Sequence, residues 1–505
     1  MIPAPAHGAT PTKPVEITQA GSEADFLQRF PAYAASHPID ALRSADYARL
    51  DSMGHVYLDY TGGGLYAESQ LRKHMDLLRN NVFGNPHSNN PTSLAMTHLV
   101  EDARRAVLNF FHADPNEYLV IFTPNCSGAL RLVGEAYPFG AGAEYLLAWD
   151  NHNSVNGIRE FAQARGATVT YLPVHAPDMR FDANEVRRHL RRPAAGPRIF
   201  AFPAQSNFSG VQHDLAWVAE AQALGWDVLL DCAAFAPTNR LDLSQVHPDY
   251  VPLSFYKLFG YPTGVGALIM RRAALQRLRR PWFAGGTITI ASVQDRGWHY
   301  LIQGEAGFED GTVNYLSLPA VEIGLKHLEK VGMEAIHSRV ACLTGWLLEE
   351  MRALRHSNGA PMLHIFGPQD TTARGGTIAF NFSDPTGAVL DYRHIEGLAS
   401  NAHISLRTGC FCNPGAGEIA HGITHDEMAQ CFAGSEPFTY NQLYEKMQQS
   451  GKTAATFRIS LGIASNFADA HAFMRFAQQF RDVDAVTFAA QPIPQLHEAL
   501  IRDVT

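Results

Sequence analysis

From about residue 118 to residue 271, short apolar runs alternate with longer amphipathic segments. The short runs are apolar on both faces, which is typical of strands that are covered on both sides in a mainly parallel sheet. The segments between them, such as 154–165 and 183–192, have the spacing of covering helices. We therefore predict an α/β fold whose mainly parallel sheet has seven strands, at 118–123, 143–149, 168–174, 198–203, 226–231, 250–255 and 266–271.

The last two predicted strands are joined by the short segment LFGYPTG. It has no room for a crossover helix, so we expect this pair to be antiparallel or irregular. The glycines here do not have the G-x-G-x-x-G spacing, and they lead into a strand instead of a helix. They therefore indicate a tight turn and not a dinucleotide site.

After residue 320 the pattern changes to that of a smaller α+β domain. A long helical stretch at 319–350 leads to strand-like runs at 376–382 and 403–406 and to a final helix near 468–481. We predict four parts of the chain: a flexible arm at 1–22, a segment at 23–60 that joins the small domain, a large domain at 61–330 and the small domain at 331–505.

Charge and hydropathy exclude several classes of function. The chain has 505 residues with 40 basic and 49 acidic side chains, and it has no basic run that could follow a phosphate backbone. No apolar run reaches the length of a membrane span, and the first residues lack the apolar core of a secretion signal. We expect no nucleic-acid partner, no membrane partner and no anchor.

The six cysteines are too sparse for a disulfide framework and suit a reducing, cytoplasmic location. Cys410 and Cys412 lie two apart, but no second pair and no histidine pair follows them. We therefore expect no metal site.

Two charged residues end successive predicted strands. Ligands of open α/β sheets bind at the carboxyl ends of the strands. Asp231 ends one buried run, and Lys257 follows Ser254 at the end of the next. A lone lysine there would be an ordinary surface residue, but a buried carboxylate is costly unless a donor meets it. Together they predict a site for pyridoxal 5'-phosphate, in which the lysine binds the cofactor covalently and the carboxylate keeps the pyridine nitrogen protonated.

Polar residues follow three other predicted strands. Cys126 and Ser127 open a helix whose N–H groups suit a phosphate, although an ordinary helix cap explains them as well. His152 is equally compatible with stacking on an aromatic ligand and with capping a helix. Asn207 lies in a polar cluster that either binds a ligand or forms a turn.

Four motifs carry a resemblance to a known family: SFYKLFGYPTGVGALIM, PAQSNFSG, DNHNSV and LRTGCFCNPGAG. They are similar to motifs in the amino-terminal, cysteine desulfurase-like part of molybdenum cofactor sulfurases, which belong to the class V aminotransferase superfamily. The similarity runs from about Tyr57 to Asp469. It implies fold type I of the pyridoxal phosphate-dependent transferases and a homodimer.

The resemblance also implies cofactor contacts for particular residues. Lys257 would form the covalent bond to the cofactor, Asp231 would contact the pyridine nitrogen, and His152 would contact the ring face. Asn207 would make a polar contact to cofactor or substrate. The phosphate contacts would be Cys126, Ser127, Ser254 and Thr312. Thr312 resembles the phosphate contact that the neighbouring subunit provides.

On the substrate side, Arg407 and Arg458 match positions that hold the α-carboxylate, a role that suits the guanidinium fork. Cys412 matches the desulfurase nucleophile. Two positions depart from the wider pattern. Ala234 stands where many desulfurases have a glutamine that bonds the ring hydroxyl, and Tyr256 stands where they have a histidine.

The resemblance implies a desulfurase-like enzyme that mobilises sulfur from L-cysteine or a related thiol amino acid through a persulfide on Cys412. The glycines and proline around Cys412 suit a mobile loop, and two passive thiols in a loop of small residues are the less favoured alternative. The sulfur acceptor, a protein or a small molecule, stays open, since the family's domain that binds the molybdenum cofactor lies outside the similarity.

Two alternatives remain. A pyridoxal phosphate-dependent C–S lyase, epimerase or other β-eliminating enzyme of a biosynthetic pathway would need Lys257 and Asp231 but not Cys412. A non-catalytic sulfur carrier or scaffold would need neither Lys257 nor Asp231.

Overall fold

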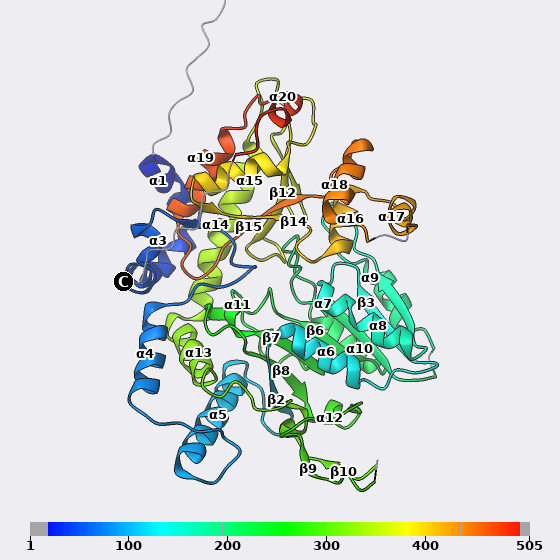
Figure 1. Cartoon of the computed structure of the whole chain (residues 1–505). Coiled ribbons are helices and arrows are strands. Elements are labelled where there is room, and N and C mark those ends of the chain that lie inside the picture. Colours follow the sequence, from blue (N-terminus) through cyan, green and yellow to red (C-terminus); the bar gives the residue numbers. More distant parts are fainter. Residues whose placement is uncertain (1–18, 194, 296, 435–436, 495–505) are drawn as a thin grey trace, which may run out of the picture.

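The computed structural model describes residues 19–193, 195–295, 297–434 and 437–494. Its largest sheet has the strand order β2-β8-β7-β6-β5-β3-β4 (Figure 1). Its strands are β2 (Tyr118–Thr123), β3 (Glu144–Ala148), β4 (Thr168–Leu172), β5 (Arg198–Pro203), β6 (Asp227–Asp231), β7 (Tyr250–Ser254) and β8 (Gly266–Arg271). β8 is antiparallel to both of its neighbours, and the other adjacent pairs are parallel. The predicted seven-stranded sheet and its antiparallel last pair are confirmed.

Both faces of this sheet are buried, as the apolar runs predict. Along β2, Val120 and Phe122 belong to one buried cluster, whereas Leu119 and Ile121 belong to another. Because successive side chains of a strand point to opposite faces, the two clusters lie on opposite sides of the sheet.

Helices cover these two faces. They are α4 (Glu68–Arg79), α5 (Pro91–Phe110), α6 (Cys126–Ala136), α7 (Asn153–Asn156), α8 (Ile158–Ala164), α9 (Ala183–Leu190), α10 (Ala216–Ala223), α11 (Phe255–Phe259), α12 (Arg272–Leu275) and α13 (Pro319–Val331). The helix predicted at 154–165 is divided at Gly157, the cap residue shared by α7 and α8. The long helix predicted at 319–350 is divided at Gly332, whose φ of 88° no helical residue adopts.

The C-terminal part contains a four-stranded antiparallel sheet of order β11-β12-β15-β14. Its strands are β11 (Leu363–Phe366), β12 (Thr377–Phe382), β14 (Arg407–Gly409) and β15 (Thr456–Ser460). Its helices are α14 (Met333–Ala353), α15 (Tyr392–Asn401), α16 (Pro414–His421), α17 (His425–Phe432), α18 (Tyr440–Gln449), α19 (Phe467–Gln478) and α20 (Ala485–Ala489). The predicted strand at 403–406 is the short β13 (Ile404–Ser405), which lies outside this sheet.

The N-terminal segment packs against this C-terminal part (Figure 1). It consists of α1 (Gln19–Arg29), the 3-10 helix η1 (Pro31–Ser36), α2 (Pro38–Asp46), α3 (Arg49–Ser52) and β1 (Val56–Tyr57). β1 pairs in parallel with β13, α1 contacts α19, and η1 contacts α14. The predicted arm at 1–22 was wrong for 19–22, because the helix that buries Phe26 begins at Gln19. Residues 1–18 lie outside the described residues, and the other domain boundaries stay a prediction.

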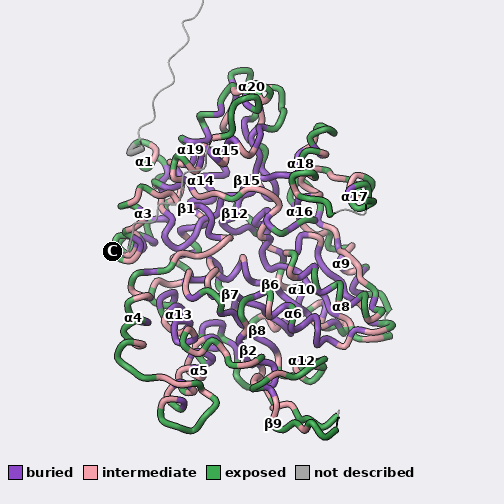
Figure 2. Tube along the Cα trace, viewed as in Figure 1, coloured by how far each residue is buried: buried purple, intermediate pink, exposed green. Residues whose placement is uncertain are grey.

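A two-stranded hairpin projects from the large sheet and is mostly exposed (Figure 2). It is formed by β9 (Ile288–Ala291) and β10 (His299–Leu301), with the 3-10 helix η2 (Glu305–Phe308) after it. Trp282, Ile290, Trp298 and Tyr300 expose large apolar side chains in this region. In the described part of the chain, no helix is long and apolar enough to span a membrane.

One buried arginine connects the N-terminal segment to the C-terminal part. Arg339 of α14 is fully buried, and its Nε donates to the carbonyl oxygen of Ser465 (2.6 Å) while its Nη1 donates to that of Ser36 (3.1 Å). Arg339 also bonds the carboxylate of Asp40 and lies over the ring of Tyr33 at 4.7 Å. A single side chain therefore satisfies acceptors from segments far apart in sequence.

We predict that Arg339→Met lowers the free energy of unfolding by about 3 kcal/mol, because buried acceptors lose their charged donor. Denaturant unfolding followed by circular dichroism measures this. Arg352→Met, at an exposed position on the same helix, serves as the control and should change the value by less than about 0.5 kcal/mol. An equal loss in the two variants would contradict the role given to Arg339.

Candidate functional site

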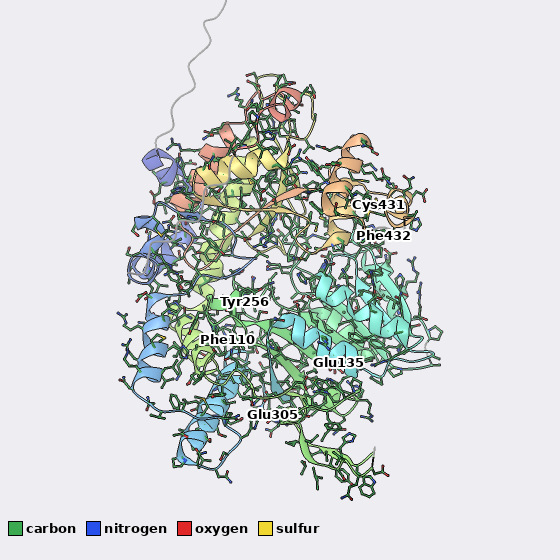
Figure 3. All side chains as sticks on the ribbon, viewed as in Figure 1. Phe110, Glu135, Tyr256, Glu305, Cys431 and Phe432 are labelled. Carbon is green, nitrogen blue, oxygen red and sulfur yellow. The ribbon has the colours of Figure 1, made fainter. Side chains whose placement is uncertain are left out.

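A cavity of about 180 Å³ lies at the carboxyl ends of β2, β3, β5, β6 and β7. Its lining residues are Asn125, Cys126, Ser127, His152, Ser154, Pro203, Gln205, Asn207, Asp231, Ala233, Ala234, Ser254, Tyr256 and Lys257. Figure 3 shows Tyr256 between the two sheets. The structure thus brings together every residue predicted to bind the cofactor except Thr312.

Lys257 lies on α11, one turn after β7 ends at Ser254. Within the described residues, its amine makes no hydrogen bond and no ion pair. The glycine-rich segment of residues 62–64 packs closely on this turn, since Gly64 N donates to the carbonyl oxygen of Tyr256 (3.0 Å). A Cβ at Gly64 would lie 2.9 Å from the carbonyl oxygen of Lys257, so only glycine fits there. The backbone of Lys257 is therefore fixed by the packing of residues 62–64, while its side-chain amine makes no bond to the described residues.

Asp231 is the last residue of β6 and is buried. Its Oδ1 accepts a hydrogen bond from Ala233 N (3.0 Å), and its other oxygen has no donor among the described residues. A buried carboxylate with a free oxygen is costly unless a ligand donates to it. The protonated nitrogen of a pyridine ring is such a donor.

The phosphate end of the cavity is built on the first turn of α6. The helix cap is Asn125, whose side chain accepts from Gly128 N (2.9 Å), so Ser127 is free for another role. Ser127 Oγ lies 2.6 Å from Ser154 Oγ, and Ser254 Oγ accepts from Cys126 N (2.8 Å). Burial raises the pKa of the Cys126 thiol well above its usual value, so this residue does not present a thiolate to the cavity.

His152 has the predicted capping role, and stacking on a ligand stays a prediction. Its Nδ1 accepts from Ser154 N (3.1 Å) and so caps α7, while its ring lines the cavity. Burial lowers the pKa of His152, and the imidazole is neutral at neutral pH. These groups fit pyridoxal phosphate. The free amine of Lys257 suits the aldehyde, the Asp231 carboxylate suits the pyridine nitrogen, and the neutral ring of His152 suits the ring face. The serine hydroxyls at the N-terminus of α6 suit the phosphate.

The two predicted carboxylate-binding arginines share one aspartate that the sequence analysis missed. Asp59 accepts from Arg407 Nε (3.0 Å) and Nη2 (2.6 Å) and from Arg458 Nη2 (3.0 Å). Arg458 is buried, and its Nε has no acceptor among the described residues, while Nη1 of the half-exposed Arg407 is also free. Burial lowers the pKa of Arg458 to about 10, and the group remains charged at neutral pH.

Asn207 lines the cavity, but its side chain is engaged with the loop that carries Cys412. Its Nδ2 donates to the carbonyl oxygen of Phe411 (2.8 Å), and its Oδ1 accepts from Asn413 Nδ2 (2.9 Å). Its predicted contact to cofactor or substrate stays a prediction, and Gln205 also lines the cavity.

The Cys412 loop is anchored at several points. Cys412 is exposed and Cys410 is partly exposed, and the carbonyl oxygen of Cys412 accepts from Asn153 N (2.7 Å). The mobile loop that the glycines and proline predicted is thus a docked loop in this structure.

The sequence did not reveal the roles of Asn413 and Asp59, because their hydrogen-bond partners lie far away in the sequence. The signal for Asp59 was its position as a polar residue beside an apolar run.

Thr312 lies outside the cofactor cavity of its own chain. It is exposed, its Oγ1 accepts from Asn85 Nδ2 (3.2 Å), and it lines a separate cavity of about 370 Å³ with Trp282 and Phe308. Among the described residues, no group of three or more potential metal ligands occurs.

Comparison with known proteins places this geometry in a family. The family model for class-V aminotransferases matches residues 56–473. The molybdenum cofactor sulfurase of Solanum lycopersicum is 35% identical over 489 residues, which cover 90% of this chain and 59% of that protein. The human molybdenum cofactor sulfurase is 34% identical, covering 95% of this chain and 55% of that protein. The chain thus spans less than two thirds of the length of these relatives.

Solved structures share the fold. A cysteine desulfurase of Thermococcus onnurineus superposes with a TM-score of 0.72 and 20% identity, covering 87% of this chain and 97% of that protein. The cystine C–S lyase C-DES gives a TM-score of 0.62 and 19% identity, covering 84% of this chain and 97% of that protein. The predicted fold type and resemblance are confirmed. The chain belongs to the class-V aminotransferase family of enzymes, and its cofactor is pyridoxal 5'-phosphate.

Proposed function

We propose that the protein is a cysteine desulfurase-like enzyme that mobilises sulfur from L-cysteine or a related thiol amino acid through a persulfide on Cys412. The observation that carries this proposal is the docking of the Cys412 loop on the cavity that contains Lys257. Asn207 lines that cavity and donates to the carbonyl oxygen of Phe411, the residue before Cys412. A loop that carries an exposed thiol and is bonded to a residue of the cofactor cavity supports transfer of sulfur to the protein.

The chain's own residues divide the work around the cofactor. When bound, pyridoxal phosphate supplies an electron sink for the Cα of an amino acid. Asp231 would accept a hydrogen bond from the ring nitrogen, and the neutral imidazole of His152 would face the ring. The amine of Lys257 would hold the cofactor and would move a proton at the substrate Cα.

The arginine pair supports a substrate with a single α-carboxylate. Asp59 balances one of the two guanidinium charges, which leaves one net positive charge and the unbonded Nη1 group of the half-exposed Arg407. A carboxylate bound there is held by charge-assisted hydrogen bonds. Fixing this group aligns the rest of the amino acid with the cavity.

Sulfur transfer then needs one nucleophilic attack. The Cys412 thiolate attacks the substrate sulfur, an S–S bond forms, and the C–S bond breaks. The electron pair of that bond stays with the substrate carbon, which takes up a proton. L-Cysteine thereby becomes alanine, and Cys412 becomes a persulfide that an acceptor reduces or takes over.

The alternative is C–S cleavage without a protein nucleophile. The fold alone does not separate the two reactions, because C-DES, described as a cystine C–S lyase, shares it. A lyase or other β-eliminating enzyme would use Lys257 and Asp231 and would be indifferent to Cys412.

We also propose a homodimer in which Thr312 of one subunit contacts the cofactor phosphate of the other. This is supported by the position of Thr312 outside its own cavity and by the exposed apolar side chains Trp282, Trp298 and Tyr300 nearby in sequence. The six free cysteines are compatible with a reducing compartment such as the cytoplasm. The sulfur acceptor, a protein or a small molecule, is not indicated by any described residue.

Lys257→Ala should abolish covalent attachment of the cofactor, because no other amine lines the cavity. The protein should lose its yellow absorbance and its borohydride-reducible bond to the cofactor, and turnover should fall by about a thousandfold. Lys326→Ala, at an exposed position on α13, is the matched control and should keep both properties. A reducible bond that survives in Lys257→Ala would disprove the lysine assignment.

Cys412→Ser should stop the formation of alanine and sulfide from L-cysteine while cofactor binding stays intact, because serine cannot accept sulfane sulfur. Alanine and sulfide are measured with and without a reductant. Cys410→Ser, two residues away, should keep most of the activity. If Cys412→Ser turns over its substrate at the wild-type rate, the lyase or eliminase function takes the place of the desulfurase.

The dimer can be tested by sedimentation velocity on the cofactor-loaded protein. We expect one dimeric species, with an interface above about 2,000 Å². Trp298→Asp should weaken association, because it places a charge on the exposed apolar hairpin. A strictly monomeric protein with full activity would contradict the shared site.

A further inference from the structure

The loop around Cys412 is held by a buried asparagine that the proposed chemistry does not use. Asn413 is completely buried, and its Nδ2 donates to the carbonyl oxygen of Asp150 (2.6 Å) and to Asn207 Oδ1 (2.9 Å). Both acceptors belong to segments that follow strands of the large sheet. The side chain therefore ties the loop to the edge of the sheet where the cofactor cavity lies.

The loop backbone is strained at the two residues before this anchor. Phe411 and Cys412 both have a φ of 54°, in the left-handed region that non-glycine residues avoid. Such a conformation persists only when the surroundings fix it, and it clusters at functional sites. Here the surroundings are hydrogen bonds to both carbonyls, from Asn207 Nδ2 to Phe411 (2.8 Å) and from Asn153 N to Cys412 (2.7 Å).

The same anchor fixes the loop relative to the arginines. The Arg458 guanidinium lies over the ring of Phe411 at 4.7 Å, and its Nη1 donates to the carbonyl oxygen of Asn207 (2.9 Å). Arg458 and Asn207 therefore contact the loop from the small sheet and from the large sheet. Moving the backbone at Phe411 would move Cys412 away from both.

We infer that Asn413 is a positioning residue that, together with Asn207, holds Cys412 in its left-handed conformation beside Arg407 and Arg458 at the cavity. This inference rests on the proposed role of Cys412. The two amide side chains act as a clamp on the loop backbone, and this clamp fixes the place of the thiol.

The simpler explanation is that Asn413 only caps α16, since its Oδ1 accepts from Ala416 N (3.2 Å). Asparagine, aspartate and serine serve almost equally well as helix caps. Asn413→Ser and Asn413→Asp therefore keep the cap, and neither has the NH₂ group that reaches Asp150 and Asn207. A neutral and a charged replacement together separate loss of the clamp from a change in local charge.

The experiment uses the pyridoxal phosphate-loaded protein with Cys410→Ser, so that Cys412 is the accessible thiol. Its rate of alkylation by iodoacetamide is measured between about pH 6 and pH 10. Hydrogen exchange of the Asn153 N–H, which donates to the carbonyl oxygen of Cys412, reports the docking of the loop. Asn90→Asp, which alters the asparagine cap of α5 away from the site, is the matched control.

We expect both Asn413 variants to change the alkylation rate of Cys412 at a given pH by at least about threefold, because the loop no longer fixes the place of the thiol. Exchange at Asn153 should become at least about tenfold faster, and Asn90→Asp should change neither readout. Wild-type values in both variants would overturn the inference. Rapid exchange at Asn153 in the wild-type protein would also overturn it, and this measurement does not depend on a variant that folds. Neither readout uses a substrate. If Cys412→Ser proves fully active, the proposed desulfurase fails while the clamp is still tested.

Discussion

Parallel pairing brings the carboxyl ends of β3, β5, β6 and β7 to one edge of the large sheet, and the cofactor site depends on this convergence. A strand buried on both faces can place a polar group only at its end. Asp231 is therefore buried where one oxygen lacks a donor, and Lys257 follows on the first turn after the next strand. These two groups suit a cationic ring and an aldehyde.

The C-terminal part completes the site from the other side. Asp59, from the N-terminal segment, holds Arg407 and Arg458 of the small sheet, and the Cys412 loop docks on Asn207 of the large one. The two arginines, the Cys412 loop and the cavity are thereby fixed relative to one another by charge-assisted and amide hydrogen bonds. Family membership accounts for the cofactor, whereas sulfur transfer from cysteine stays a proposal that rests on this docking.

The fold was largely predictable because its signals are local. Buried strands show as apolar runs, and all seven strands were found within two residues of their observed ends. That the residues at the strand ends would meet at one cavity was predictable for the same reason. The side-chain partners were not: Asp59, Asn413 and the loop contact of Asn207 join segments about 200 residues or more apart in sequence. No periodicity encodes such pairs. The glycine that divides the long helix at 332 was visible, but its left-handed φ was not.

The central claim is that Cys412, docked at the Lys257 cavity, accepts sulfur from the substrate. The most direct measurement is peptide mass spectrometry of the pyridoxal phosphate-loaded protein, alkylated after a short incubation with L-cysteine in the absence of reductant. The account predicts an added mass of about 32 Da, one sulfur atom, on Cys412 and not on Cys410. Release of sulfide with both cysteines unmodified at every time point would contradict it.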